Sequence, residues 1–520
     1  MPRAKTPSFV AEIPLRTTAA DEAALEMRLD AARNIYNAAL GESLRRLDLM
    51  RESLEWRRAR AMPKGEPRSV ERKARAAAFK AALERFGFTA GSIQKFAEGC
   101  RDGCWLGDHL GSHDTQTASL RAFRAVEQYA FGRRGRPRFK GKRRLHSIEG
   151  KSNEAVIRFR TDPVPAVHYA GLVLPLWLDR KDKRGWQAAA LDVPTKYVRI
   201  VRRTIKGRAR WFCQLVQAGP APLLREPVAG VVSFDLGPST IAAVSDEDAI
   251  LEPLCPEVEE PWQEIRRLQR ALDRSRRATN PENYNADGTV RRGSRRWRRS
   301  ARYKQRQRRK AELERKLAQR RRRAHGQLGN RILGQGNTIK AEKLNYRSLQ
   351  KNYGRSVKVR APGMLVSELR RKAERAGGGM IEINPRKTAL SQFDHTTGTY
   401  VKKPLSQRMH VFGDGQTEPV QRDIYSASLA SCCDRDTLDI RRVHETWPAV
   451  QPLLRRAMAR ADQPASGRGF ALPHVRKGVG AGCPPKKDGR TGEAVDAYPD
   501  ASRARAAESV FNGPFRTHWL

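Results

Sequence analysis

The apolar residues of the first 130 positions recur with the periods of one strand followed by long helices. Residues 9–15, FVAEIPL, have the composition of a strand. Thr18 and Asp21 follow at the spacing of a capping box, which predicts a helix start. Polar and Ala-rich helical patterns continue to about residue 130, with a break at residues 62–67. Five apolar residues repeat on one face of the first helix and predict its core: Leu25, Leu29, Ala32, Tyr36 and Leu40.

Strand patterns dominate the middle of the chain. Residues 197–205 and 211–216 alternate across a Lys-Gly-Arg turn and predict a β-hairpin. Residues 229–240, AGVVSFDLGPST, place three apolar β-formers before Asp235, and Gly and Pro then break the strand. Residues 241–251 predict one further strand. Asp235 is therefore expected at the end of a strand.

Helical and strand patterns alternate in the second half. Residues 337–346, NTIKAEKLNY, contain a short strand closed by Glu342, and a helix over 363–376 precedes a strand over 380–383. Asp423 opens another helix, whose apolar residues can face a sheet. From about residue 462 the sequence has no periodicity, and we expect disorder there.

Composition points to a nucleic-acid partner. A chain of 520 residues is too long for one core, so two to four units are expected. Its formal net charge of +46 would repel itself in a free globule unless a polyanion were bound along the surface. An anionic membrane is the alternative, but the chain has no long apolar run and its N-terminus has no signal-peptide core. We therefore predict a cytoplasmic protein with no membrane partner.

Two segments carry much of this charge. Residues 132–144 hold eight Arg and Lys around Phe139, and Gly and Pro keep the segment extended, so that it could follow phosphates while Phe139 stacks on a base or pins the loop. Residues 261–330 hold 24 Arg and Lys against 6 Asp and Glu, with two helices predicted around a loop over 279–294. The alternatives are a solvated loop for the first segment and a disordered basic arm for the second.

The cysteines do not predict a disulfide framework or a zinc site. Seven cysteines, an odd number, fit a reducing compartment, and none forms a Cys-x-x-Cys pair. Cys100, Cys104, His109 and His113 come nearest to a metal cluster, but their central gap is far shorter than that of a zinc finger. A helix end followed by a Gly-rich loop is the expectation.

Three carboxylates carry the chemistry that the pattern predicts. Asp235 and Glu342 end strands, and Asp423 begins a helix. Carboxylates in this order form the arrangement with which an RNase H-like sheet holds two divalent metals about 3.5 to 4 Å apart, one activating water and the other stabilising the leaving oxygen of a phosphodiester. Mg²⁺ or Mn²⁺ is the expected cofactor.

Five motifs in order resemble those of the TnpB-type nucleases, transposon-encoded relatives of the compact type V CRISPR effectors. The three RuvC nuclease motifs are matched at Asp235 and Gly237, at Glu342, Leu344 and Asn345, and at Arg422, Asp423, Ser426 and Ala427. Tyr425 departs from the third motif, where the family usually has Asn. The N-terminal helix motif is matched at Arg33, Tyr36, Asn37 and Leu40, and a Pro-Arg-Phe-Lys box at Pro137, Arg138, Phe139 and Lys140.

The resemblance implies an α/β fold with all-β and helical parts. A wedge-like β-barrel would comprise residues 1–18 and 132–228, interrupted by a helical recognition lobe over 19–131. A split RuvC-like, RNase H-like nuclease would comprise 229–382 and 420–460, with a basic helical insertion over 258–328. Residues 383–419 would be a degenerate zinc-ribbon-like, target-loading subdomain, and 461–520 a disordered tail.

The family's zinc ribbon carries two Cys-x-x-Cys pairs, and this chain has none of those cysteines. His395 and His410 with Asp394 and Asp414 could still make a metal site. The preferred expectation is a ribbon without zinc that is held by apolar packing or reduced to a loop. This departure puts the loading of the target strand in doubt.

The resemblance also implies a function and its residues. We expect an RNA-guided DNA endonuclease with a guide RNA and a target DNA as partners, in which Asp235, Glu342 and Asp423 bind two Mg²⁺. The alternatives are a nuclease-inactive RNA-guided DNA binder and a guide-independent transposase. The residues expected to contact nucleic acid are Arg33, Arg136, Arg138, Phe139, Lys140, Arg295, Arg296, Arg298 and Arg299.

Overall fold

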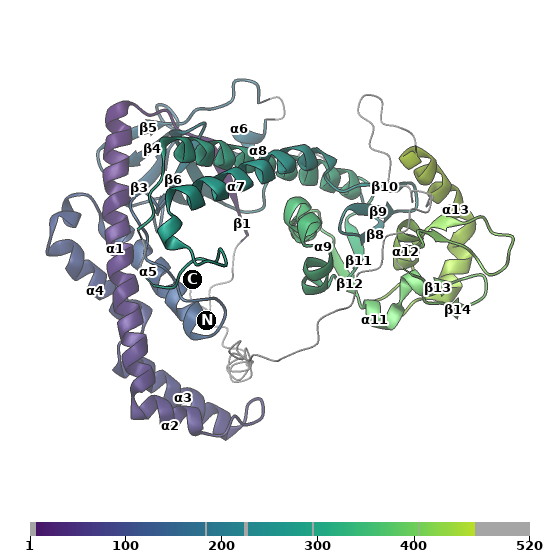
Figure 1. Cartoon of the computed structure of the whole chain (residues 1–520), viewed down its shortest axis with the longest axis horizontal. Helices are drawn as coiled ribbons and strands as arrows, with labels where there is room; N and C mark the ends of the chain where they lie inside the picture. The colour runs from purple at the N-terminus through teal and green to yellow at the C-terminus, as the bar shows by residue number, and fades with distance from the viewer. Residues whose placement is uncertain (1–6, 183–184, 223–226, 294–295, 405, 463–520) are drawn as a thin grey trace. The chain divides into compact units, whose positions relative to one another are not determined.

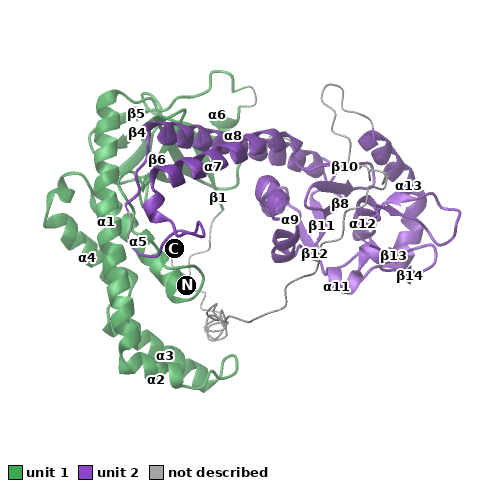
Figure 2. Ribbon diagram, in the orientation of Figure 1, with its two compact units in different colours: residues 1–224, 485–520 green, residues 225–484 purple. Residues whose placement is uncertain are grey.

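The computed structural model describes residues 7–182, 185–222, 227–293, 296–404 and 406–462 (Figure 1). The chain separates into two compact units, residues 1–224 with 485–520, and residues 225–484 (Figure 2). The tail for which disorder was predicted lies almost wholly outside the described residues. No helix in the described part combines the length and apolarity needed to cross a membrane.

The first unit joins a helical group to two small sheets. Its helices are α1 (Ala19–Glu52), α2 (Leu54–Ala61), α3 (Val70–Arg85), α4 (Ala90–Asp102), η1 (Trp105–Asp108), α5 (Ser112–Ala130) and α6 (Trp186–Leu191). Its strands are β1 (Ser8–Pro14), β2 (Ser147–Glu149), β3 (Ile157–Arg160), β4 (Ala166–Tyr169), β5 (Leu172–Pro175), β6 (Thr195–Ile205) and β7 (Arg208–Ala218). The predicted capping box is present, since Asp21 N donates to Thr18 Oγ1 at 3.2 Å and Thr18 N donates to Asp21 Oδ2 at 2.9 Å.

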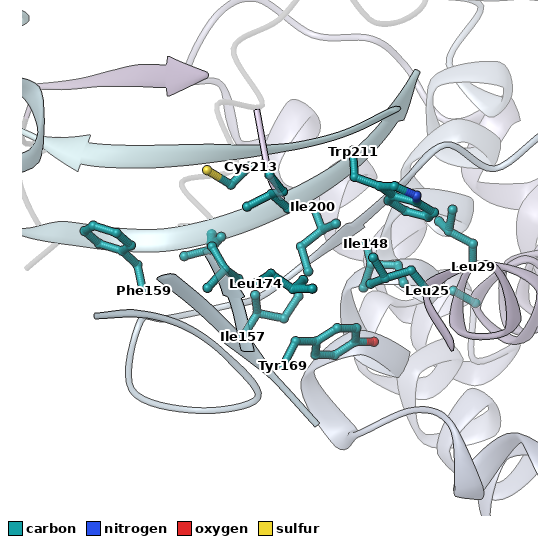
Figure 3. Close-up of a cluster of buried hydrophobic side chains, with 14 of the residues drawn as sticks. Leu25, Leu29, Ile148, Ile157, Phe159, Tyr169, Leu174, Ile200, Trp211 and Cys213 are labelled. Carbon is teal, nitrogen blue, oxygen red and sulfur yellow. The ribbon is translucent and has the colours of Figure 1, made fainter. Parts of the chain in front are cut away.

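The strands of this unit form two sheets rather than the predicted barrel. One sheet has the order β1-β7-β6-β2 and the other β3-β4-β5, and among the described strands neither closes on itself. The predicted hairpin is β6 and β7, with Lys206 and Gly207 at positive φ in its turn. Both sheets and α1 share one core, in which Leu25 and Leu29 meet Ile157 and Trp211 (Figure 3). The burial of the predicted α1 stripe is confirmed.

The second unit is built on a five-stranded sheet of order β10-β9-β8-β11-β12. Strands β8 (Val231–Leu236), β11 (Thr338–Glu342) and β12 (Gly379–Ile383) are parallel, whereas β9 (Thr240–Val244) and β10 (Ala249–Pro253) extend the sheet as an antiparallel hairpin. The prediction of one strand over 241–251 was therefore wrong. Ser245 splits it, because its hydroxyl accepts hydrogen bonds from the amides of Glu247 and Asp248 and closes a turn.

Helices cover both faces of this sheet. On one face lie α7 (Glu259–Thr279), α8 (Ala301–Leu333), α9 (Tyr346–Arg360) and α10 (Pro362–Arg375), and on the other α12 (Arg422–Ser431) and α13 (Ile440–Asp462). The remaining elements are η2 (Pro256–Val258), η3 (Pro281–Asn283), α11 (Pro385–Thr388), η4 (Leu390–Gln392), β13 (Phe393–Asp394), β14 (Thr399–Tyr400), β15 (Met409–His410) and β16 (Val420–Gln421). Alternation along β8 separates the two cores, since Val232 and Phe234 face the α7, α8 and α10 side.

Candidate active site

Strand register places two of the predicted carboxylates side by side. Ala341 of β11 pairs with Phe234 of β8 in parallel register. Glu342 and Asp235 therefore occupy the next matched position, at the carboxyl ends of neighbouring strands. Because Phe234 and Ala341 point into the core beneath α7, α8 and α10, Asp235 and Glu342 point to the opposite face of the sheet.

The third carboxylate arrives on the helix that covers this opposite face. Helix α12 packs against β8, β9 and β11 and begins one residue before Asp423. Gln421 caps it, since its side-chain oxygen accepts a hydrogen bond from Ile424 N at 2.9 Å. Thr240 Oγ1 of β9 lies 3.4 Å from Asp423 Oδ2 and links the carboxylate to the sheet. The structure thus brings Asp235, Glu342 and Asp423 to one end and one face of the sheet.

The pKa directions reflect this convergence. Burial, followed by the nearby charges of Asp423 and Glu342, raises the pKa of Asp235 well above its ordinary value, and Arg422 opposes the rise. Burial alone raises the pKa of Glu342. Each carboxyl is half-buried, so ionising the group confines negative charge where water screens it poorly. A bound cation would relieve that repulsion.

The chemistry of the three side chains suits a hard divalent cation. All three side chains offer carboxylate oxygens, the ligands that Mg²⁺ and Mn²⁺ prefer. Within the described ranges, no three His, Cys, Asp or Glu side chains lie in an arrangement that could hold a metal ion. The three carboxylates are therefore a loose acidic cluster at one end of the sheet. Mg²⁺ suits such a cluster because it usually keeps several of its waters and takes only one or two protein carboxylates.

Lys340 is a buried residue of this site that sequence reasoning missed. It lies two residues before Glu342 and on the same face of β11, with only 7% of its surface exposed. Its Nζ donates hydrogen bonds to Ser431 O at 2.9 Å and Cys433 O at 2.7 Å, at the carboxyl end of α12. Lys340 therefore holds the helix that carries Asp423 against the strand that carries Glu342. A lysine within the apolar run TIKAE was the available signal.

The predicted ribbon, residues 383–419, is held by aromatic packing. It contains the hairpins β13–β14 and β15–β16, of which the second is completed by residues just beyond the ribbon. Phe393 and Phe412 enter the core formed with α12. The centre of the His410 ring lies 4.3 Å from the centre of the Tyr425 ring and 4.7 Å from the centre of the Phe412 ring. The expectation of apolar packing is confirmed for these residues.

The two departures from the TnpB-type motifs, which this chain otherwise resembles, meet in this cluster. Tyr425, which stands where the third motif usually has Asn, is fully buried. Its hydroxyl lies 2.9 Å from His395 Nδ1 and accepts a hydrogen bond from His395 N at 3.2 Å. Asp394 accepts from Gly413 N at 2.8 Å and so joins the two hairpins. Tyr425 therefore ties α12, which carries Asp423, to the ribbon.

Residues expected to contact nucleic acid in the first unit differ in their availability. Arg33 pairs with Asp30 at 2.9 Å and lies 3.5 Å from Lys140 O, so it has partners within the chain. Asn37 fixes the 132–144 loop by exchanging two hydrogen bonds with the Lys140 backbone, at 2.9 and 2.8 Å. Lys140 Nζ lies 5.3 Å from the centre of the Tyr36 ring, and burial lowers its pKa. Arg33 and Lys140 therefore help to hold the loop.

Three of the predicted contact residues in this loop face solvent. Arg136 and Arg138 are exposed, and 61% of Phe139 is exposed. The guanidinium Nη2 of Arg136 lies 3.8 Å from Asp48 Oδ2, which makes a long ion pair. An exposed aromatic ring that follows an exposed arginine is available for stacking on a base.

The arginines of the second unit stand at the tip of a helical hairpin formed by α7 and α8. The side chain of Asn280 donates to Arg298 O at 3.1 Å and accepts from Arg298 N at 2.6 Å, and Asn283 Nδ2 donates to Arg296 O at 3.0 Å. The alternative of a disordered basic arm is wrong for the described residues. Arg296, Arg298 and Arg299 are exposed, whereas Arg295 lies outside the described residues.

Comparison with known proteins finds only distant likenesses. No protein-family model matches the chain, and no curated protein matches it. The Cas12f1–sgRNA–target DNA complex is 10% identical over 82% of this chain and 98% of that one, with a TM-score of 0.42. A CRISPR-Cas12f ternary complex is 12% identical over 81% and 83% of the two chains, with a TM-score of 0.27. Both likenesses are too weak to assign a fold, an activity or a partner to this chain.

Proposed function

We propose that this chain is a metal-dependent nuclease that cuts DNA chosen by a bound guide RNA. The observation that supports the nuclease is the convergence of Asp235, Glu342 and Asp423, from three distant segments, on one end and one face of the sheet. A helix terminus and two strand ends hold them, so their positions depend on rigid elements rather than on loops. The guide and the target are supported by the motif order and by the net charge of +46.

The side chains of the site have separate tasks in this proposal. Asp235, Glu342 and Asp423 would hold Mg²⁺, which supplies Lewis-acid activation of the phosphodiester when bound. Because the pKa of Asp235 is raised by burial and by two carboxylates, protons compete with the cation there. Thr240 and Lys340 set the position of α12, and Arg422 lies beside Asp423, with 3.9 Å between Nε and Oδ1.

The test is a cleavage assay beside a binding assay. The protein is expressed with its flanking locus, its bound RNA is sequenced, and a plasmid matching that RNA is offered with Mg²⁺ or Mn²⁺. Asp235→Ala, Glu342→Ala and Asp423→Ala should each abolish cutting, since each removes charge and oxygen ligands from the site. Binding should persist because basic surfaces elsewhere hold the nucleic acid. Asp246→Ala, an exposed carboxylate on the β9–β10 turn, is the matched control and should cut normally.

Each rival function gives a different result. A wild-type protein that binds the target and never cuts is an inactive RNA-guided binder. Cutting or joining of DNA that proceeds without bound RNA identifies a guide-independent transposase. If the Asp235→Ala variant still cuts DNA, the three carboxylates are not the active site.

A further inference from the structure

The two sheets of the first unit meet at the end of β1. Leu15, the residue after β1, forms an antiparallel bridge with Leu176, the residue after β5. Trp177 N donates a hydrogen bond to Pro14 O at 2.7 Å, so the segment that follows β5 runs beside β1 as a neighbouring strand would. On its other side β1 pairs with β7, where Pro14 opposes Phe212. Pro14 therefore lies between Trp177 and Phe212.

These three residues face away from the core. Opposed residues of antiparallel strands carry their side chains on the same face, and successive residues of a strand alternate between the two faces. Trp177 and Pro14 are exposed, and Phe212 is half-buried. Their neighbours in the chain lie in the core, where Figure 3 labels one of them: Leu15, Leu176 and Trp211. Trp177, Pro14 and Phe212 therefore form an apolar row across the outer face of three strands.

A row of arginines lies beside the apolar row. Leu15 N donates a hydrogen bond to Trp211 O at 2.9 Å, and beyond this bond the chain continues with Arg16 on one strand and Arg210 on the other. Arg210 pairs with Arg203 of β6. Because Leu15 and Trp211 point into the core, alternation places these arginines on the outer face. Arg16, Arg210 and Arg203 therefore form a cationic row.

Two of the three arginines lack a partner. Arg16 and Arg210 are exposed, and among the residues that the structure describes neither forms a side-chain hydrogen bond or an ion pair. Arg203 differs, because it is paired with Glu12 and its guanidinium carbon lies 5.5 Å from the centre of the Phe212 ring. The carboxylate of Glu12 is thus already engaged. A bound anion would supply the counter-charge that Arg16 and Arg210 lack.

The ring of Trp177 is open to solvent. Its exposed fraction is 60%. The guanidinium carbon of Arg16 lies 5.9 Å from the centre of this ring, farther than the roughly 3.5 to 4 Å between atoms in stacked contact. Arg16 is therefore near enough to be attracted by the ring but does not cover it. A planar group can reach the indole ring from solvent.

We propose that the outer face at Trp177, Arg16 and Arg210 binds an unpaired stretch of nucleic acid, with a base stacked on the indole ring and phosphates on the two guanidinium groups. Cations alone would bind any polyanion, whereas an exposed indole ring adds a surface on which every base can stack. Sheet faces that carry aromatic side chains hold unpaired bases in this way. Positions two residues apart along a strand are separated by roughly 6.6 Å, so the arginines stand beside the stacked base rather than beneath it. This binding is independent of the proposed nuclease, because these residues lie in the first unit and the three carboxylates in the second.

The experiment compares two strands that differ only in their bases. A fluorescent oligodeoxythymidine of about 8 nucleotides and an abasic strand of the same length are offered, in EDTA, to the full chain freed of bound RNA. Trp177→Ala should weaken binding of the thymidine strand roughly 5- to 150-fold, the value of one stacked base, and leave binding of the abasic strand unchanged. Trp177→Phe should recover most of the affinity because it restores a ring. The matched control is Trp105→Ala, at a tryptophan of the same unit that is 46% exposed, and it should bind both strands as the wild type does.

The arginines are tested through the salt dependence of binding. Arg16→Gln with Arg210→Gln should flatten the slope of log K against log salt by about 1.4 for both strands, the contribution of two phosphates on a single strand. Arg57→Gln with Arg60→Gln removes the same charge from exposed positions of α2 and should leave the slope unchanged. Equal flattening by the two pairs would mean that the charge acts diffusely and would overturn the assignment of the phosphates.

Photo-crosslinking locates the base directly. A strand with one thymine replaced by iodouracil should, on irradiation, form an adduct on the peptide that contains Trp177, identified by mass spectrometry. Adducts confined to other peptides would overturn the proposal. Equal losses for the thymidine and abasic strands in Trp177→Ala would also overturn it, because the ring would then support the fold rather than a base. Wild-type affinity of Trp177→Ala for both strands would overturn it as well, and is the result expected if this face docks a protein.

Discussion

Replacing Lys340 tests how the candidate site is assembled. Its ammonium group is buried on β11 and donates to two carbonyl oxygens at the end of α12, Ser431 O and Cys433 O. Lys340→Met keeps the length and apolar body of the side chain and removes only the charged donor. Both carbonyl oxygens then lose a partner within the packed layer between the sheet and the helix.

The magnitude follows from these two hydrogen bonds. Bonds that involve a charged group contribute about 1.5 to 3 kcal/mol each. Removing both should therefore cost about 3 kcal/mol or more, even after the desolvation of the ammonium is relieved. For a unit of this size about 3 kcal/mol lowers the melting temperature by roughly 6 to 12 °C. The loss should fall on the second unit, because both partners lie in it.

The assay combines thermal unfolding with single-turnover cleavage. Lys343→Met is the matched control, because Lys343 lies three residues along the same segment and is exposed. We expect Lys340→Met to slow cleavage with little change in target binding, and Lys340→Arg to recover part of the rate because it restores a donor. Equal melting temperatures for Lys340→Met and Lys343→Met would refute the reasoning. If Lys340→Arg cleaves as slowly as Lys340→Met, the shape of the lysine side chain, and not its hydrogen-bond donor, positions α12.

Three further predictions concern charge and metal. The pKa of Asp235 is raised in the folded state, so as pH rises above 3.8 this carboxyl loses its proton more readily in the unfolded chain, and it increasingly destabilises the fold. Asp235→Asn in EDTA should therefore raise the melting temperature at pH 7, whereas the control Asp246→Asn, at an exposed carboxylate, should not. Replacing the exposed Arg296, Arg298 and Arg299 with Ala should flatten the salt dependence of RNA binding by about 2 on a single strand, and an unchanged slope would mean that they never touch RNA. Residues 388–421, which include most of the ribbon, should hold less than one zinc per chain and should not unfold with a zinc chelator. Phe412→Ala should cost about 3 to 5 kcal/mol because Phe412 is buried, and stoichiometric zinc by elemental analysis would contradict the prediction of a ribbon without zinc.

Local patterns in the sequence were enough to predict several elements. The Thr18 capping box and the α1 stripe, the β6–β7 hairpin and the start of α12 beside Asp423 all depend on residues close in the chain. Their period or cap acts over a few positions, so it can be read without tertiary contacts. The order of Asp235, Glu342 and Asp423 along the chain could likewise be read from the sequence.

Other features required the folded chain. Helix α9 has a polar sequence with a glycine at its break, and contacts such as Ser356 with Pro238 and Arg360 with Leu254 hold it in place. The division of 241–251 into two strands depended on a turn of only a few residues at Ser245. Arg33 matched an RNA-contact motif, but its position gives it Asp30 and the Lys140 carbonyl as partners.

The sequence by itself determined which residues could supply carboxylate chemistry and how much positive charge surrounds them, because residue type and order do not depend on the fold. Only the tertiary structure decided that Asp235 and Glu342 share a face, since parallel register between β8 and β11 aligns them. It alone decided that α12 lies on that face, where Lys340 holds one end and Asp423 stands at the other. The physical reason is that alternation within a strand offers two faces, and only packing against a second layer selects between them.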